Sequence, residues 1–259
     1  MTKRNQAIKR ERTKLQVFSK GLRSRSDVYH RQYRLDQRMR RVVAELPERV
    51  DRPNLRALYR DWGDPLAEDN WQFIDKCVDE ALLTEGPILQ CGSSFTTFVL
   101  GAICHASASP NKHLWTLEHQ PQWGNLVRAR LAQYGVEKAH IINSPAEIFD
   151  DFVWYLIDPG KLPANFTLVI CDGSHALPSG VQGLLTRCGD RLDHRSVILV
   201  RNINRPKDLN FAAKWAKQHG APFILDGKEQ PYVKIALRDQ RPESVLTEDR
   251  INTIYAART

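Results

Sequence analysis

The chain has 259 residues, enough for one large domain or for one domain with an appendage. Hydrophobic residues make up 42% and charged residues 26%, and no apolar run reaches the roughly 18 to 20 residues that span a bilayer. The positively charged N-terminus lacks the apolar stretch of a secretory signal, and the five cysteines form no C-x-x-C pair. These features predict a cytoplasmic protein with buried free thiols, and they disfavour disulfide or zinc roles.

The formal net charge of +8 is concentrated near the N-terminus. Residues 1–50 hold 15 Lys and Arg against five Asp and Glu, so they carry +10 and the remaining 209 residues carry −2. The spacing of Leu35, Met39, Val42, Val43 and Leu46 predicts at least one amphipathic helix in this basic arm. Such an arm suits contact with nucleic acid, contact with an anionic membrane, or pairing with a second copy of the chain as a homo-oligomer. A solvated basic helix without a ligand is an equal alternative.

The chain then passes from a connector into regular alternation. Pro and Gly residues punctuate residues 47–70, which predicts a connector, and a helix is expected over 68–83. Further on, helices are expected over 95–106, 121–134, 146–156, 179–191 and 207–219. Strands are expected over 87–91, 113–118, 139–143, 167–172, 196–201, 222–226 and 232–237.

This alternation predicts an α/β fold with a doubly wound, mostly parallel, seven-stranded Rossmann-like sheet. The gap between the last two strands is too short for a helical crossover, so the last strand should be antiparallel. We therefore expect two parts, a basic helical arm and linker over 1–66 and the α/β domain over 67–259.

Small and polar residues follow each of the first five predicted strands. In such sheets ligands bind at the carboxyl ends of the strands. A turn of small residues after one strand, with an acid at the tip of the next, is typical of a nucleotide site, because the acid can hold two ribose hydroxyls. The residues at these ends are Gly92, Ser93, Ser94, Thr96 and Thr97, then Glu118 and His119, Asn143 and Ser144, Asp172 and His175, and Arg201 and Asn202.

Four of these segments carry a family resemblance. ILQCGSSFTTFVLG, LWTLEHQPQWGNLVRARLAQYGV, HIINSPAE and LVICDGSH resemble four successive motifs of class I S-adenosylmethionine-dependent methyltransferases. They are most similar to the small O-methyltransferase-like branch, whose first motif reads E-x-G-S-G-x-S-T and whose fourth reads D-G-x-H. The resemblance spans about residues 70–237 and implies S-adenosyl-L-methionine as the cofactor.

The resemblance also implies a role for each matching residue. Gly92, Ser93 and Ser94, with Gln90 and Thr96 beside them, would hold the methionine part of the cofactor. Glu118 would accept hydrogen bonds from both ribose hydroxyls, and His119, Asn143 and Ser144 would surround the adenosine. Asp172 would face the transfer site, and His175 would act as the general base that removes the acceptor's proton.

Three departures from the family pattern bear on function. Gln90 stands where the family has an acid, and Ser94 stands where it has a second glycine. Metal-dependent relatives place two acidic or amide residues where this chain has Arg201-Asn202, and an arginine there would repel a divalent cation. The sequence therefore predicts metal-independent transfer, and Arg201 either holds an anionic substrate or pairs with Asp172.

Several functions stay open at this point. The first is methyl transfer to an oxygen of a small-molecule or glycan acceptor. The second is an RNA methyltransferase anchored by the basic arm, although no Asn/Asp-Pro-Pro-Tyr/Phe run follows the fourth strand. The third is a non-catalytic protein that keeps the fold and binds a partner. A nicotinamide dehydrogenase is disfavoured because the first turn lacks G-x-G-x-x-G.

Overall fold

We describe a computed structural model of the chain, covering residues 25–46, 50–63, 67–172, 177–203, 205–227 and 230–237. The chain divides into two compact units, Met1–Glu68 and Asp69–Thr259, which are described separately. Within the described ranges, none of the helices combines the length and the apolar character needed to cross a membrane.

In the part of the first unit that the structure describes, two helices pack together, α2 (Arg25–Glu45) and α3 (Arg52–Trp62). The predicted helical spacing on α2 is confirmed, with Leu35, Met39 and Val42 buried. The prediction of a connector over 47–70 was wrong in part, because α3 lies inside this range. Pro53 is at the start of α3, where its missing N–H costs no hydrogen bond, and Gly63 ends the helix with a φ of +94°.

The basic side chains of α2 are largely used inside this unit. Arg38 donates to Asp61 at 3.0 Å, and Arg41 donates to Glu45 at 2.7 Å and to Asp51 at 2.9 Å. These pairs offset charge that would otherwise face a ligand. Most of the remaining arm, residues 1–24, lies outside the described residues.

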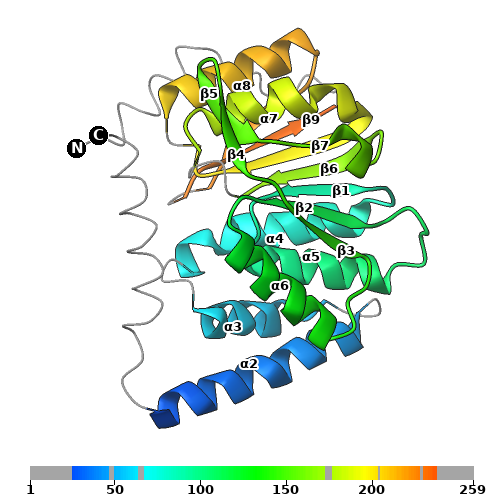
Figure 1. Ribbon diagram of the computed structural model, residues 1–259, viewed down its shortest axis with the longest axis vertical. Coiled ribbons are helices and arrows are strands. Elements are labelled where there is room, and N and C mark those ends of the chain that lie inside the picture. The colour runs from blue at the N-terminus through cyan, green and yellow to red at the C-terminus, as the bar shows by residue number, and fades with distance from the viewer. Residues whose placement is uncertain are drawn as a thin grey trace. The chain divides into compact units, whose positions relative to one another are not determined.

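The second unit is built on a seven-stranded sheet, flanked by helices (Figure 1). Its strand order is β3-β2-β1-β6-β7-β9-β8. The strands are β1 (Ile88–Cys91), β2 (Leu114–Glu118), β3 (Ala139–Asn143), β6 (Phe166–Cys171), β7 (Leu192–Arg201), β8 (Phe223–Asp226) and β9 (Tyr232–Ala236).

The pairing of these strands confirms the predicted fold class. Strands β1, β2, β3, β6 and β7 pair in parallel, and β9 pairs antiparallel with both β7 and β8. Strands β1 and β6 are the most enclosed, since their residues are buried on both faces with the single partial exception of Thr167. The seven predicted strands are all present.

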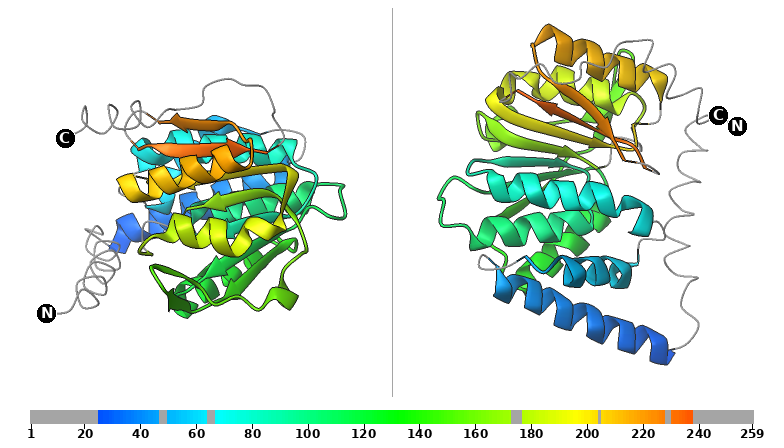
Figure 2. Two further views of the ribbon diagram at one scale, coloured as in Figure 1. Left: turned by 90° about the horizontal axis from the view of Figure 1, so that it is seen from above. Right: turned by 180° about the vertical axis from the view of Figure 1, so that it is seen from behind.

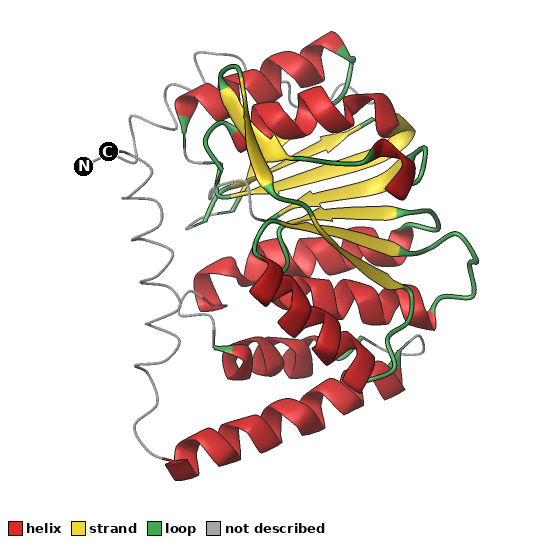
Figure 3. Cartoon of the chain, viewed as in Figure 1, coloured by secondary structure: helices red, strands yellow, loops and turns green. Residues whose placement is uncertain are grey.

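Helices cover both faces of the sheet, as the two views of Figure 2 and the colouring of Figure 3 show. Helices α7 (Gly180–Cys188) and α8 (Pro206–Gln218) lie on one face, and α4 (Ala67–Leu83), α5 (Phe95–Ala106) and α6 (Pro121–Gln133) lie on the other. Short 3-10 turns lie at η1 (Pro159–Lys161) and η3 (Gly189–Arg191).

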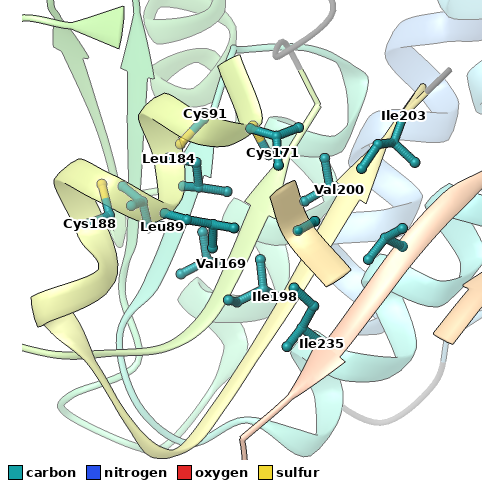
Figure 4. Close-up of a cluster of buried hydrophobic side chains, with 14 of the residues drawn as sticks. Leu89, Cys91, Val169, Cys171, Leu184, Cys188, Ile198, Val200, Ile203 and Ile235 are labelled. Atoms are coloured by element: carbon teal, nitrogen blue, oxygen red, sulfur yellow. The ribbon is translucent and has the colours of Figure 1, made fainter. Parts of the chain in front are cut away.

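The core beneath α7 is apolar and closely packed. Figure 4 shows Leu89, Val169 and Ile198 of three neighbouring strands pointing toward Leu184 of α7. All five cysteines are buried and free, as predicted from their scattered positions. Burial raises the pKa of the Cys188 thiol to about 12, so this thiol stays protonated and acts as a small apolar side chain.

The helix predicted over 146–156 is wrong. This segment forms a two-stranded antiparallel hairpin of β4 (Ala146–Phe149) and β5 (Phe152–Tyr155). Phe149 and Phe152 face each other across the turn with ring centroids 5.5 Å apart, and Asp150 adopts a φ of +32°. Aromatic and β-branched side chains favour a strand pair over a helix here, and the two aspartates supply the turn.

Candidate functional site

The sheet order brings the predicted site residues together. Strands β2, β1, β6 and β7 are neighbours, so their carboxyl ends lie along one edge. Glu118, the loop after Cys91, Asp172 and Arg201 follow these four ends in turn. We call this edge the carboxyl-edge site.

The loop from β1 to α5 is fixed by its backbone. Gly92 has a φ of +89°, a conformation that side chains with a Cβ rarely adopt, and its N–H donates to Leu117 at 2.9 Å. Ser94 caps α5 and forms a reciprocal capping box with Thr97. The indole N–H of Trp123 donates to the carbonyl of Ser93 at 2.8 Å, a contact that the sequence did not reveal.

Glu118 is bound to this loop from the tip of β2. Only 3% of Glu118 is exposed. Its Oε2 accepts from both the N–H and the hydroxyl of Ser93, at 2.9 and 2.5 Å, and its Oε1 accepts from the N–H of Gln120 at 2.8 Å. These donors fill about three of the roughly four acceptor positions of a carboxylate.

Asp172 holds the other side of the loop. Its Oδ2 accepts from the hydroxyls of Ser94 at 2.7 Å and Thr96 at 2.9 Å. Gln90 is fully buried below them, where its amide donates to Thr96 at 3.0 Å and accepts from Thr116 at 3.3 Å. An acid at position 90 could not make that donation when ionised, so the glutamine belongs to this particular network.

Arg201 completes the site from the end of β7. Its Nε lies 2.5 Å from Oδ1 of Asp172, and only 11% and 6% of the two side chains are exposed. The N–H does not align with that oxygen, so the contact is an ion pair and not a regular hydrogen bond. The guanidinium also lies over the ring of Phe73, 5.8 Å from its centroid. Of the two roles predicted for Arg201, the structure shows the pair with Asp172.

The residues expected near adenosine lie beside Glu118. Ser144 is buried, and its N–H donates to the carbonyl of Glu118 at 2.8 Å, whereas Asn143 is exposed. The ring of His119 packs edge-on to Tyr155, with centroids 6.1 Å apart. A Cβ at Gly124 would lie 2.6 Å from Oδ1 of Asn143 and 3.3 Å from Cγ of Glu118, so the helix α6 packs closely against this side of the edge at Gly124.

The contacts above do not test two predictions, the general base at His175 and transfer without a metal. His175, the predicted general base, lies outside the described residues. Among the residues that the structure describes, no group of three or more His, Cys, Asp or Glu could hold a metal ion.

The comparisons with known proteins give only distant similarities to solved structures. No family model matches the chain, and no curated protein matches it. A methyltransferase from Podospora anserina, solved with S-adenosylhomocysteine (SAH) bound, is 18% identical over 74% of this chain and 89% of its own, with a TM-score of 0.49. A putative O-methyltransferase from Klebsiella pneumoniae is 14% identical over 67% and 90%, with a TM-score of 0.44.

An rRNA methylase from Streptococcus thermophilus is similarly distant, at 14% identity over 63% of this chain and 95% of its own, with a TM-score of 0.44. Such low values carry no conclusion about activity, so the function is inferred from the site residues.

Proposed function

We propose that the carboxyl-edge site binds S-adenosyl-L-methionine and that the chain transfers its methyl group to an oxygen of a small-molecule or glycan acceptor. One observation carries the proposal: a glycine-serine loop is bracketed by two buried carboxylates, Glu118 and Asp172, at the ends of the two strands that flank β1. When bound, the cofactor supplies an electrophilic methyl group on a sulfonium.

The donor set around Glu118 fits the ribose of this cofactor. A vicinal diol needs two acceptors close together, which one carboxylate provides. The hydroxyl of Ser93 occupies part of Oε2, and this serine can give up that position to a ribose hydroxyl while its N–H keeps the carboxylate in place.

The Asp172–Arg201 pair fits transfer to oxygen without a metal. A fixed guanidinium beside the transfer region stabilises an acceptor oxygen as its proton leaves, and it repels a divalent cation. The proposal assigns removal of the acceptor's proton to His175, three residues after Asp172.

A non-catalytic binding protein is the second candidate. The observation that favours it is that both carboxylates are already engaged by donors of the chain itself. An RNA methyltransferase has weaker support, because four arginines of α2 are paired with nearby acids, namely Arg34, Arg38, Arg40 and Arg41.

Calorimetric titration with S-adenosylmethionine and with SAH tests the proposal. We expect Glu118→Ala to weaken binding about tenfold or more, which corresponds to losing hydrogen bonds worth about 1.4 kcal/mol. Glu137→Gln, at an exposed position outside the site, is the matched control and should bind as wild type. An absence of binding to wild type at millimolar ligand would reject both the cofactor and the activity.

A second variant tests the ribose assignment specifically. Because the Ser93 hydroxyl competes with the ribose for Oε2, Ser93→Ala should bind the cofactor at least as tightly as wild type. A large loss in Ser93→Ala would show that the ribose does not use this oxygen. Transfer of an isotope-labelled methyl group to a panel of phenols and sugars, compared with RNA, then separates the acceptor classes.

A further inference from the structure

A second binding region lies at the opposite edge of the sheet. A cavity of about 980 Å³ opens at the amino ends of β1, β2, β3 and β6 and the start of β7. Its wall comes from the loops before these strands, and it includes none of the carboxyl-edge residues. We call it the amino-edge cavity. Its volume is in the range of small-molecule sites.

Three aromatic rings form one wall of this cavity. His113, Trp115 and His140 come from the adjacent strands β2 and β3 and from the residue before β2. Nδ1 of His113 and Nε2 of His140 are 2.9 Å apart, and the two ring planes differ by only 6°. An imidazole N–H lies in the plane of its ring, so a hydrogen bond between nearly parallel rings joins them edge to edge. The pair therefore forms one flat surface.

The ring of Trp115 borders this surface. Its plane is inclined by 42° to His140 and by 37° to His113, with centroids 5.1 and 5.6 Å away. Partial desolvation lowers the pKa of His140, and the neighbouring His113 lowers it further. A flat aromatic surface favours stacking with a planar ligand.

The polar groups that line the amino-edge cavity narrow the chemical class of its ligand. Asn111 and Asn165 each carry an amide with donors and an acceptor, which match the edges of a nitrogen heterocycle. The charged lining consists of Glu85, Asp193 and Arg195, and Arg195 is paired with Asp193 at 3.5 Å. The lining thus carries a formal charge of −1, which disfavours a phosphate.

We propose that the amino-edge cavity binds a neutral planar heterocycle of the nucleobase type, as a free base or nucleoside, stacked on the His113–His140 surface. This site is separate from the proposed cofactor site and does not depend on it. It gives the chain a second ligand, on the edge of the sheet away from the proposed methyl transfer.

Titration with adenosine and guanosine tests the proposal, measured by calorimetry with the Glu118→Ala variant of the full chain. This background removes the ribose contact at the carboxyl edge. We expect saturable binding, and a loss of about tenfold with His140→Ala, since stacking on an aromatic side chain is worth about 1–3 kcal/mol. Asn111→Ala, in an exposed loop, should weaken binding as well.

His194→Ala is the matched control, because His194 is exposed on β7 and does not line the cavity. It should bind as wild type. Three results would overturn the proposal: no nucleoside binding, equal affinity in His140→Ala and its parent, or tighter binding of AMP than of adenosine. Binding of a quaternary ammonium probe without any nucleoside binding would also overturn it and indicate a cation site. The cofactor proposal fails by a different result, the absence of SAH binding to wild type.

Discussion

The buried ion pair between Arg201 and Asp172 makes a quantitative prediction about stability. Replacing Arg201 by Met keeps an apolar stem of similar length near Phe73 but removes the charge. Asp172 then keeps its hydrogen bonds to Ser94 and Thr96 but loses its cation in a region where only 6% of its side chain is exposed.

The expected cost follows from the contact distance and the burial. The 2.5 Å Nε–Oδ1 contact brings the charge centres to a separation at which two unit charges attract by roughly 4 kcal/mol, at an effective dielectric constant of about 20. Breaking one side of a buried pair costs about 3–5 kcal/mol, because it leaves an uncompensated charge. Replacing both partners removes that penalty, so the double variant Asp172→Asn/Arg201→Met should be more stable than the sum of the single variants predicts, by about 2–3 kcal/mol.

Urea unfolding followed by circular dichroism measures these free energies. The control is Arg195→Met, since Arg195 is 68% exposed in its side chain and its pair with Asp193 at 3.5 Å is worth at most about 1 kcal/mol. Equal destabilisation by Arg201→Met and Arg195→Met, or simple additivity in the double variant, would refute the reasoning.

Two further predictions concern packing and pH. A Cβ at Gly183 would lie 2.8 Å from the ring of Trp154, so Gly183→Ala should lower the free energy of unfolding by about 1–3 kcal/mol in urea, whereas Gly189→Ala, with its nearest neighbours at 3.8 Å, should be near neutral. Burial alone would raise the pKa of Glu80, but hydrogen bonds from two lysines, Lys234 at 2.9 Å among them, lower it below the ordinary 4.5. A carboxyl with a lowered folded-state pKa stabilises the fold above about pH 4.5 and loses this contribution as the pH falls. The midpoint temperature of thermal unfolding should therefore fall more steeply from pH 6 to pH 3 for wild type than for Glu80→Gln. Parallel plots of midpoint against pH for the two proteins would contradict this prediction.

The sheet was predictable because its strands carry a strong local signal. Runs such as Leu168–Cys171 and Val197–Val200 are apolar throughout, and alternation with helices fixed their parallel pairing. The two segments whose secondary structure was predicted wrongly, 47–70 and 146–156, carry weaker local signals. Pro53 is a turn former as well as a helix starter, and the apolar residues of 146–156 fit a helix until the two aspartates are taken as a hairpin turn.

The grouping of the candidate site residues at one edge of the sheet was predictable, but their contacts were not. Glu118 and Asp172 became candidates because ligands of such sheets bind at strand ends. The pairing of Arg201 with Asp172 depends on side-chain directions, which the order of residues does not contain. The amino-edge cavity was missed because His113 and His140 lie at the start of strands, where no ligand was sought.

The position of β1 between β2 and β6 also has a consequence for how the protein folds. On one side β1 pairs with β2, which follows soon after it, but on the other it pairs with β6, some 80 residues later in the chain. Contacts over such long separations slow folding, because a large loop must close first. During synthesis one edge of β1 therefore waits for β6 to leave the ribosome. Ser94 and Asp172, 78 residues apart, can meet only with this closure, so their hydrogen bond marks the joining of β6 to β1.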